Sequence, residues 1–215
     1  MTIYKASEVT MIDHMGSDLT VVNAARVSFN KTSSSLTEKD IKLINYLAKH
    51  HHWSPFAHCF LQFRIKAPIF VARQLVKHQV GLSWNEVSRR YVNEEPEFYT
   101  PVSWRQKPED SKQGSSGVAE SQYFPSTYLK DVVDKASEAY QKMIMQGIAP
   151  EMARMILPQN THTEWYWSGS LYAFSRLCKQ RLDPHTQQET REVAKIINEK
   201  AELIFPISWK SLLEN

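Results

Sequence analysis

The chain has 215 residues, and its 42% hydrophobic content is enough to build one sizeable domain, expected to span residues 1–215. The formal net charge of +3 is too small for a protein that coats nucleic acid, so nucleic acid is not an expected partner. The isolated Cys59 and Cys178 form no disulfide or metal motif, and residues 1–13 lack the apolar centre of a signal peptide. We therefore expect a cytoplasmic protein, and no apolar run is long enough to predict a membrane span.

The N-terminal elements are predicted from apolar spacing. Weak alternation over residues 2–12 predicts a strand that Gly16 ends, and 18–28 has the pattern of a helix. Thr37, with Asp40 three residues later, resembles a capping box at the start of a second helix. The apolar positions of that helix follow at helical spacing: Ile41, Ile44, Leu47 and Ala48.

Three consecutive histidines, His50 to His52, follow this helix and invite a metal interpretation. Consecutive helical residues point about 100° apart, so three of them do not converge on one ion. Cationic histidine at a helix C-terminus is the simpler explanation, because it opposes the helix dipole. No metal site is expected.

A second strand is predicted at residues 57–66, where apolar and polar residues alternate. A helix follows, with Pro68 expected at its first position, where a missing N–H costs nothing. In this helix Arg73 lies four residues before Lys77, and Gln74 lies four before His78, so each pair shares a side. Two cations, an amide and an imidazole are therefore expected together at its C-terminal end.

A polar segment follows Gly81, and it mixes arginine, serine and asparagine with Trp84 and Tyr91. Arginine binds phosphate through two parallel hydrogen bonds, and serine or asparagine can recognise the edge of a base. This mixture favours binding of a flat anionic molecule such as a nucleotide. The alternative is a solvated charged loop, which is usually richer in Lys, Glu, Gly and Pro.

The C-terminal half is predicted to be mainly helical. The expected order is a long loop or lid at 92–125, a long helix at 126–146, a short helix at 150–158, a strand at 161–168, a helix at 169–181 and a last helix from Pro184. The long helix is expected to bury Leu129, Val132, Val133, Ala136, Tyr140, Met143 and Ile144. The aromatic residues 165–167 are interpreted as core.

Two arginines need partners. Arg154 lies on the short apolar helix between two prolines, and burying an unpaired guanidinium is costly. An internal carboxylate or a bound anion would satisfy it, and the sequence leaves both open. Arg181, followed by Asp183 and His185, raises the same question.

The segment at 66–91 resembles the signature of the flavin-dependent thymidylate synthases. That signature is Arg-His-Arg, seven residues and Ser, with Asn-Glu inside and Arg-Tyr just after. The counterparts here are Lys77-His78-Gln79, eight residues to Ser88, Asn85-Glu86 and Arg90-Tyr91. Five segments resemble family segments in the same order: AARVSF at 24–29, SPFAH at 54–58, KAPIFVARQ at 66–74, PEMARMILP at 150–158 and RLDPH at 181–185.

The resemblance implies a fold and a reaction. The fold would be α+β, with an antiparallel or mixed sheet flanked by helices and with long helices in the C-terminal half. The protein would be a homotetramer with active sites shared between subunits. It would bind FAD, take NADPH as electron donor and methylenetetrahydrofolate as carbon donor, and reductively methylate dUMP at C5 to give dTMP.

The resemblance also implies site residues. Those expected to hold dUMP are Gln74, Ser88, Arg89, Arg90, Arg154 and Arg181, and those expected around FAD are Ser28, His52, Ser54, Lys77, His78, Gln79, Asn85, Glu86 and His185. Ser170 and Arg176 stand where family members often carry asparagine. Arg181 and Ser88 are assigned catalytic roles: Arg181 would stabilise negative charge on the uracil, and Ser88 would hydrogen-bond the substrate. Ser88 is not expected to act as a nucleophile, because no base is evidently placed for it.

The chain departs from the signature at three points. Lys77 and Gln79 replace two arginines, and lysine does not reproduce a guanidinium fork. One extra residue precedes Ser88, and Gly81 could accommodate it. These departures keep alternatives open: hydroxymethylation of dUMP, methylation of UMP, or a non-catalytic nucleotide- or RNA-binding module, which would show steep salt dependence and no flavin.

Overall fold

The computed structural model describes residues 6–92, 94–109 and 113–215. A four-stranded sheet runs through its centre in the order β1-β2-β6-β3. Its strands are β1 (Glu8–Met15), β2 (Phe60–Pro68), β3 (Leu82–Glu86) and β6 (His162–Ser170), and every neighbouring pair is antiparallel. A separate two-stranded ribbon joins β4 (Arg105–Gln106) to β5 (Ser116–Val118).

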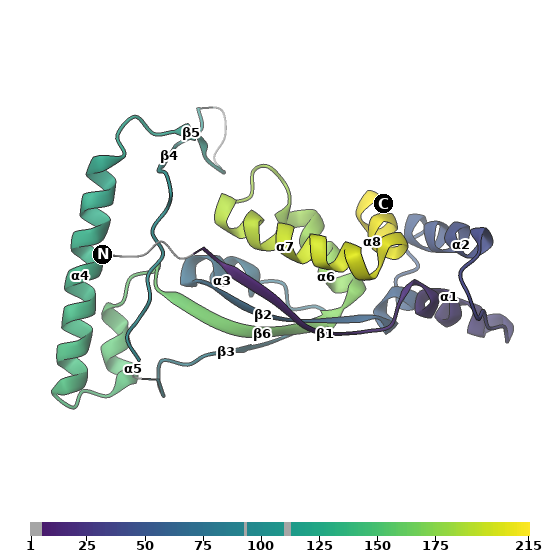
Figure 1. Ribbon diagram of the computed structural model, residues 1–215, viewed down its shortest axis with the longest axis horizontal. Helices are drawn as coiled ribbons and strands as arrows, with labels where there is room; N and C mark the ends of the chain where they lie inside the picture. The colour runs from purple at the N-terminus through teal and green to yellow at the C-terminus, as the bar shows by residue number, and fades with distance from the viewer. Residues whose placement is uncertain (1–5, 93, 110–112) are drawn as a thin grey trace.

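Helices surround this sheet (Figure 1). Those near the sheet are α1 (Asp18–Arg26), α2 (Glu38–Lys49), α3 (Ile69–Leu75), α6 (Leu171–Arg181), α7 (Gln188–Ile204) and α8 (Pro206–Glu214). Helices α6, α7 and α8 lie over one face, α1 and α2 lie at one end, and α4 (Tyr123–Met145) with α5 (Pro150–Ala153) lies beyond the other end. Short 3-10 turns are η1 (Val27–Phe29), η2 (Ser54–His58) and η3 (Arg154–Ile156). The expected α+β fold is confirmed.

The core lies between the sheet and the helices that cover it. Phe63 pairs with Trp167 and Ile65 with Trp165, and all four side chains are buried on the same face. Trp84 of β3 stacks on Trp165, with ring centroids 4.3 Å apart. The core interpretation of residues 165–167 is confirmed for both tryptophans, whereas Tyr166 points to the other face and is 44% exposed.

The predicted helix after the second strand is shorter than expected. Pro68 still pairs with His162 in the sheet, so it is the last residue of β2 and the N-cap of α3, not its first helical residue. Helix α3 ends at Leu75, which leaves Lys77 and His78 outside it. The chain turns at Gly81, where φ is +77°, and then pairs with β6 as β3. Residues 82–86 therefore pair with the edge of the sheet at β6 and do not extend the helix. This strand was not predicted from the sequence.

Other boundaries also move. The first strand occupies Glu8–Met15, not 2–12, and residues 1–5 lie outside the described part. The last long helix starts at Gln188, not Pro184, because Asp183 holds a turn by accepting hydrogen bonds from the backbone of His185. Pro206 then starts the separate helix α8. The loop prediction for 92–125 holds apart from β4, β5 and the first turn of α4, with residues 93 and 110–112 outside the described part.

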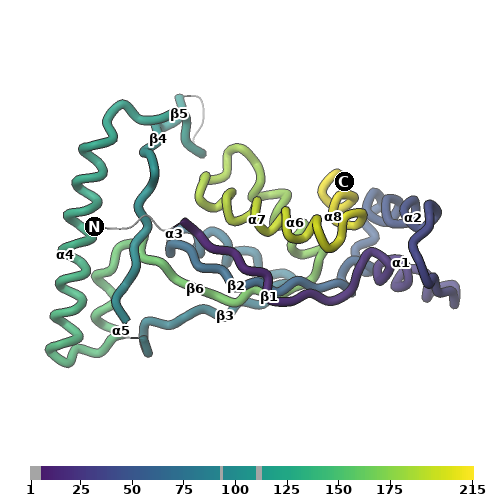
Figure 2. Tube along the Cα trace, viewed as in Figure 1, coloured from purple at the N-terminus to yellow at the C-terminus, as the bar shows by residue number. Residues whose placement is uncertain are grey.

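The long helix α4 starts three residues earlier than predicted, and its expected buried stripe is mostly not buried. Only Val133 and Tyr140 of that stripe are buried, and Val132 is 53% exposed. The reason is its position: α4 packs beside α5 and η3 beyond the end of the sheet, not across the core (Figure 2). None of the helices within the described ranges has the length and apolar character needed to cross a membrane.

Two buried carboxylates hold the N-terminal helices in place. The predicted capping box is present, because Asp40 accepts hydrogen bonds from the backbone N–H of Thr37 at 2.9 Å and from its hydroxyl at 2.6 Å. Asp40 also pairs with Arg26 of α1. Asp18 accepts from the backbone N–H groups of Ile207 and Ser208, which belong to the first turn of α8. Asp18 thereby links the N-terminal helix α1 to the C-terminal helix α8.

Gly169 lies very close to the backbone of Gly81 and Leu82. A Cβ atom at this position would lie 2.3 Å from the carbonyl oxygen of Gly81 and 2.5 Å from a Leu82 methyl carbon. We expect Gly169→Ala to force β3 away from β6 and to lower the free energy of unfolding by about 1–3 kcal/mol. Urea denaturation measures this. Gly117→Ala is the matched control, because nothing lies within 4 Å of its Cβ; equal stability losses in both variants would contradict the expectation.

Candidate functional site

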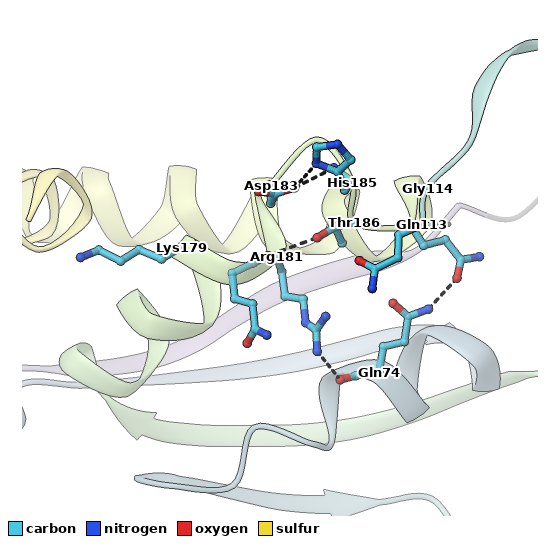
Figure 3. Close-up of a pocket in the computed structure, with 10 residues that line it drawn as sticks. Gln74, Gln113, Gly114, Lys179, Arg181, Asp183, His185 and Thr186 are labelled. Carbon is cyan, nitrogen blue, oxygen red and sulfur yellow. Dashed lines mark hydrogen bonds and ion pairs between the residues drawn. The ribbon is translucent and has the colours of Figure 1, made fainter. Parts of the chain in front are cut away.

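Three of the predicted site residues line a cavity of about 610 Å³, called here the Arg181 cavity (Figure 3). It is formed by α3, by the end of α6 with the loop that follows, and by the segment after β4. Its lining is Gln74, Gln113, Gly114, Lys179, Gln180, Arg181, Asp183, His185, Thr186 and Gln187. The structure therefore brings Gln74 and Arg181, both expected at the nucleotide, to one cavity with His185, which was expected at the flavin.

Two groups from a distant part of the sequence, at positions 74 and 78, accept hydrogen bonds from Arg181. Its Nε donates to His78 Nε2 at 2.9 Å, and one terminal nitrogen donates to the backbone carbonyl of Gln74 at 3.2 Å. Because His78 Nε2 accepts a bond, the proton of the neutral ring is on Nδ1. Burial lowers the pKa of His78, and the charges of Arg181 and Arg176 lower it further. His78 is therefore a neutral acceptor that orients a guanidinium.

Two hydrogen bonds also fix the side chain of Gln74. Its Nε2 donates to Gln187 Oε1 at 2.5 Å, and its Oε1 accepts from the hydroxyl of Thr190 at 3.2 Å. Thr190 is fully buried on α7. These two bonds determine which end of the amide is donor and which is acceptor, so the orientation of Gln74 toward the cavity is set before any ligand arrives.

A tight loop closes one side of the cavity. Asp183 Oδ1 accepts from the backbone N–H of His185 at 2.7 Å and contacts its ring Nδ1 at 3.0 Å. Gly114 lies against this loop: a Cβ there would be 3.3 Å from the His185 carbonyl, and its φ of +83° is one that glycine tolerates best. Asp183 therefore pairs with His185 and not with Arg181, and Arg181 lines the cavity.

A second cavity, called here the histidine cleft, has a volume of about 750 Å³. It lies between α1, α2 and η2, and its lining includes Ser28, Phe29, Tyr46, His50, His51, His52, Trp53 and Ser54. Three residues predicted for the flavin, Ser28, His52 and Ser54, thus meet here. The lining combines exposed aromatic faces with hydroxyl and imidazole groups, which suits a flat ring system. Within the described residues no group of histidine, cysteine and carboxylate side chains could hold a metal.

The signature residues after Gly81 form a third group along β3 and the turn beyond it. Glu86 accepts from the Thr163 hydroxyl at 2.6 Å and from the Trp84 indole at 3.1 Å. The Ser88 hydroxyl accepts from Arg90 Nε at 3.2 Å. Arg89 donates to the Glu94 carbonyl at 3.0 Å. Asn85 is exposed on β3. Lys77 and Gln79 are also exposed, in the turn before it.

The position of Arg154 differs from the one expected from the sequence. It is exposed on η3, and its Nε donates to the backbone carbonyl of Glu151 at 3.4 Å. The burial expected from its apolar neighbours is wrong, because the short α5–η3 segment lies at the end of the sheet and not over the core. Within the described residues Arg154 forms no ion pair with a carboxylate. Arg181 lines the Arg181 cavity, whereas Arg90 and Arg154 are not among the described residues that line it.

Sequence reasoning missed several residues of the Arg181 cavity. Thr190 and Gln187 orient Gln74, and neither belongs to a recognisable motif. A signal existed for Thr190, since its hydroxyl lies in line with the apolar residues Val193, Ala194 and Ile197 of α7. Ser170 has a structural role: it is the N-cap of α6, and its hydroxyl accepts from the backbone N–H of Ala173 at 3.2 Å. Arg176 is exposed one and a half turns before Arg181.

Protonation of His78 would remove the acceptor for Arg181 and place a like charge beside it. The pKa of His78 is below its usual 6.5 in the folded protein, so its contribution to stability is fully present above pH 6.5 and is lost as pH falls below it. We expect thermal unfolding at pH 8 and pH 5.5 to show a larger loss for the wild type than for His78→Gln, which keeps an uncharged acceptor. Parallel pH profiles would count against this role.

Both cysteines are buried and neither lines the cavities described above. Burial raises the pKa of Cys59 to about 12, and burial also raises the pKa of Cys178. Because the thiolate is the reactive form, we expect a thiol reagent such as 5,5′-dithiobis(2-nitrobenzoic acid) to label neither cysteine in native protein at pH 7.5. Both should react after denaturation in urea. Rapid labelling of the native protein would contradict the burial.

Three comparisons place this geometry among known proteins. The family described as "Thymidylate synthase complementing protein" matches residues 10–207. A flavin-dependent thymidylate synthase of Thermus thermophilus is 39% identical over 207 residues, which cover 96% of this chain and 76% of that protein. A flavin-dependent thymidylate synthase of Kosmotoga olearia is 36% identical over 211 residues, covering 95% and 89% of the two chains.

A solved structure agrees with these relatives. The crystal structure of the UMP/dUMP methylase PolB from Streptomyces cacaoi, bound with 5-Br dUMP, superposes with a TM-score of 0.89 at 28% identity, covering 100% of this chain and 97% of that one. Sequence family, relatives and fold all point the same way. This chain belongs to the thymidylate synthase complementing protein family, whose curated relatives are flavin-dependent thymidylate synthases.

Proposed function

We propose that this chain is a flavin-dependent thymidylate synthase that reductively methylates dUMP at C5, with methylenetetrahydrofolate as carbon donor and NADPH as reductant. The observation that carries the proposal is the Arg181 cavity, where Arg181 donates hydrogen bonds to His78 and to the Gln74 carbonyl. The relatives named as flavin-dependent thymidylate synthases support it, since they cover almost the whole chain.

Arg181 would act on the pyrimidine ring. His78 and Gln74 engage its Nε and one terminal nitrogen, and its other terminal nitrogen has no hydrogen-bond partner within the described chain. A uracil carbonyl accepting from that nitrogen would have the negative charge on its oxygen and on N3 stabilised as C5 becomes nucleophilic. Gln74, held by Thr190 and Gln187, would present its remaining N–H to the base.

The histidine cleft fits a flavin. Ser28, His52 and Ser54 would hold FAD there, and Lys77, His78, Gln79, Asn85, Glu86 and His185 would contact its remainder. Bound FAD would supply the redox chemistry of the reaction. The fit rests on the lining, in which the aromatic rings of Phe29, Tyr46 and Trp53 are exposed beside hydroxyl and imidazole groups. Such a surface binds an isoalloxazine face while leaving its polar edge hydrogen-bonded.

The proposed function includes a homotetramer with active sites shared between subunits, and the placement of the predicted residues supports it. The predicted residues of one chain fall into separate groups: the Arg181 cavity, the histidine cleft, the turn after β3 with Ser88, Arg89 and Arg90, and the exposed Arg154. Joining subunits would bring groups from different chains to one nucleotide. The long helix α4 offers a surface for this, because it exposes Tyr123, Phe124, Tyr128 and Val132.

A second function, methylation of UMP, has a specific observation in its favour. The superposable Streptomyces protein is a methylase of both UMP and dUMP, and Lys77 and Gln79 here replace the two arginines of the family signature. Mass spectrometry of the product from dUMP and from UMP distinguishes the two, and it also detects the 16-dalton difference that hydroxymethylation would leave. A non-catalytic RNA-binding module is disfavoured because the arginines do not line one stripe.

The direct test is turnover. Purified protein reconstituted with FAD should be yellow and should convert dUMP to dTMP when given methylenetetrahydrofolate and NADPH. We expect Arg181→Lys to lower kcat/KM for dUMP by about tenfold to a hundredfold, because a lysine cannot bond two neighbours and a substrate in one plane. Arg73→Lys is the matched control: Arg73 is an exposed arginine of α3. A protein that binds no FAD, or an unchanged kcat/KM in Arg181→Lys, would refute the proposal.

A further inference from the structure

One wall of the Arg181 cavity comes from the chain after β4, through Gln113 and Gly114 (Figure 3). These two residues begin a stretch, called here the wall segment, that spans residues 113–118 and ends with β5. Strands β4 and β5 form a two-stranded sheet of their own, separate from the central sheet. The ladder of the central sheet therefore does not fix this wall, and its position depends on contacts from β4 and the wall segment to the rest of the molecule.

Arg105 of β4 makes such a contact, because its guanidinium bonds two partners at once. Its Nε donates to the Ser115 hydroxyl of the wall segment at 2.7 Å, and one terminal nitrogen donates to Glu189 Oε1 of α7 at 2.7 Å. The Glu189 side chain is only 5% exposed. Burial acts to raise its pKa, but hydrogen bonds and the charge of Arg105 hold that pKa below the usual value, so the carboxylate is ionised at neutral pH. Arg105 thus links the wall segment to a buried, charged group of α7.

The same turn of α7 also orients Gln74 in the Arg181 cavity. Gln187, the N-cap of α7, accepts a hydrogen bond from the Gln74 amide, and the Thr190 hydroxyl donates to that amide. Glu189 lies between Gln187 and Thr190 in the sequence. One turn of helix therefore orients a side chain of the cavity directly and holds the wall segment through Arg105.

Gly114 shows how closely the wall segment approaches the loop after α6. A Cβ atom at this position would lie 3.3 Å from the His185 carbonyl oxygen and 3.5 Å from its Cα atom. The wall segment is thus packed against this loop, which also lines the cavity. Loss of the Arg105 link would let Gln113 and Gly114 move away from the loop and widen the cavity, so a bound ligand would lose contacts.

We propose that Arg105 is a positioning residue for the nucleotide site, because it links Ser115 to Glu189. This link keeps Gln113 and Gly114 in the wall of the Arg181 cavity. Arg105 is not among the described residues that line the cavity, so it acts through the wall segment and not by touching the nucleotide. The inference rests on the proposed function for the identity of the ligand, which is taken to be dUMP.

The first test measures nucleotide binding in a variant that releases the wall segment but keeps the buried ion pair. Ser115→Ala removes the hydroxyl that accepts from Arg105, and Ser115 is exposed, so no cavity is left in the core. With full-length protein loaded with FAD, we expect isothermal titration calorimetry to show a Kd for dUMP about three- to tenfold higher. KM should rise by a similar factor while kcat stays within about twofold, because Arg181 keeps both of its acceptors.

Two further variants serve as controls. Ser115→Thr retains the hydroxyl and should bind dUMP like the wild type. Ser121→Ala should do the same, because it removes an exposed hydroxyl that lies before α4 and outside the wall segment. An unchanged Kd in Ser115→Ala, or an equal weakening in Ser121→Ala, would overturn the proposal.

The second test needs no ligand. Hydrogen exchange followed by mass spectrometry reports on the backbone amides of β5, which pairs with β4. We expect these amides to exchange about fivefold faster in Ser115→Ala, and those of α7 to exchange as in the wild type. Equal rates in β5, or faster exchange throughout α7, would refute the link. If the wild type binds no dUMP, the proposed function fails, and this measurement still decides whether Arg105 holds the wall segment.

Discussion

The pairing of β6 with both β2 and β3 is the constraint on which the rest of the structure depends. Its buried face carries Trp165 and Trp167, and its last residues approach the turn at Gly81 so closely that only glycine fits at position 169. Helix α6 starts directly after β6, capped by Ser170, and ends at Arg181. The turn with Ser88 follows β3. One strand therefore determines where two distant groups of functional side chains lie.

The Arg181 cavity shows how a cation is kept in place without a carboxylate. A carboxylate partner would neutralise Arg181 and reduce its attraction for an anion. His78 and the Gln74 carbonyl instead bond the guanidinium and leave its charge intact. The arrangement works only while His78 is neutral, and the nearby charges of Arg181 and Arg176 help to keep it so. The Arg181 guanidinium is thus oriented by its neighbours while it keeps its full charge.

The structure shows where Lys77 and Gln79, which replace the two arginines of the family signature, lie relative to Arg181. Lys77 and Gln79 are exposed in the turn between α3 and β3, whereas His78 between them accepts a hydrogen bond from Arg181 Nε. Neither flanking side chain takes part in the two hydrogen bonds from Arg181 to His78 and to the Gln74 carbonyl, so the replacement of the two signature arginines leaves these bonds in place.

The sequence by itself determined the α+β class, the capping box of Thr37 with Asp40, the core role of the tryptophans and the family resemblance, because each depends on local spacing or on an ordered series of motifs. It also assigned Gln74 and Arg181 to one ligand, and these two residues line the same cavity. Only the tertiary structure decided that α3 stops at Leu75, that Gly81 leads into a strand, and that Arg154 is exposed. Those outcomes depend on competition for the edge of β6 and on where α4 and α5 pack. Contacts between residues far apart in the sequence determine the strand pairing at β6 and the packing of α4 and α5. Local periodicity does not reveal such contacts.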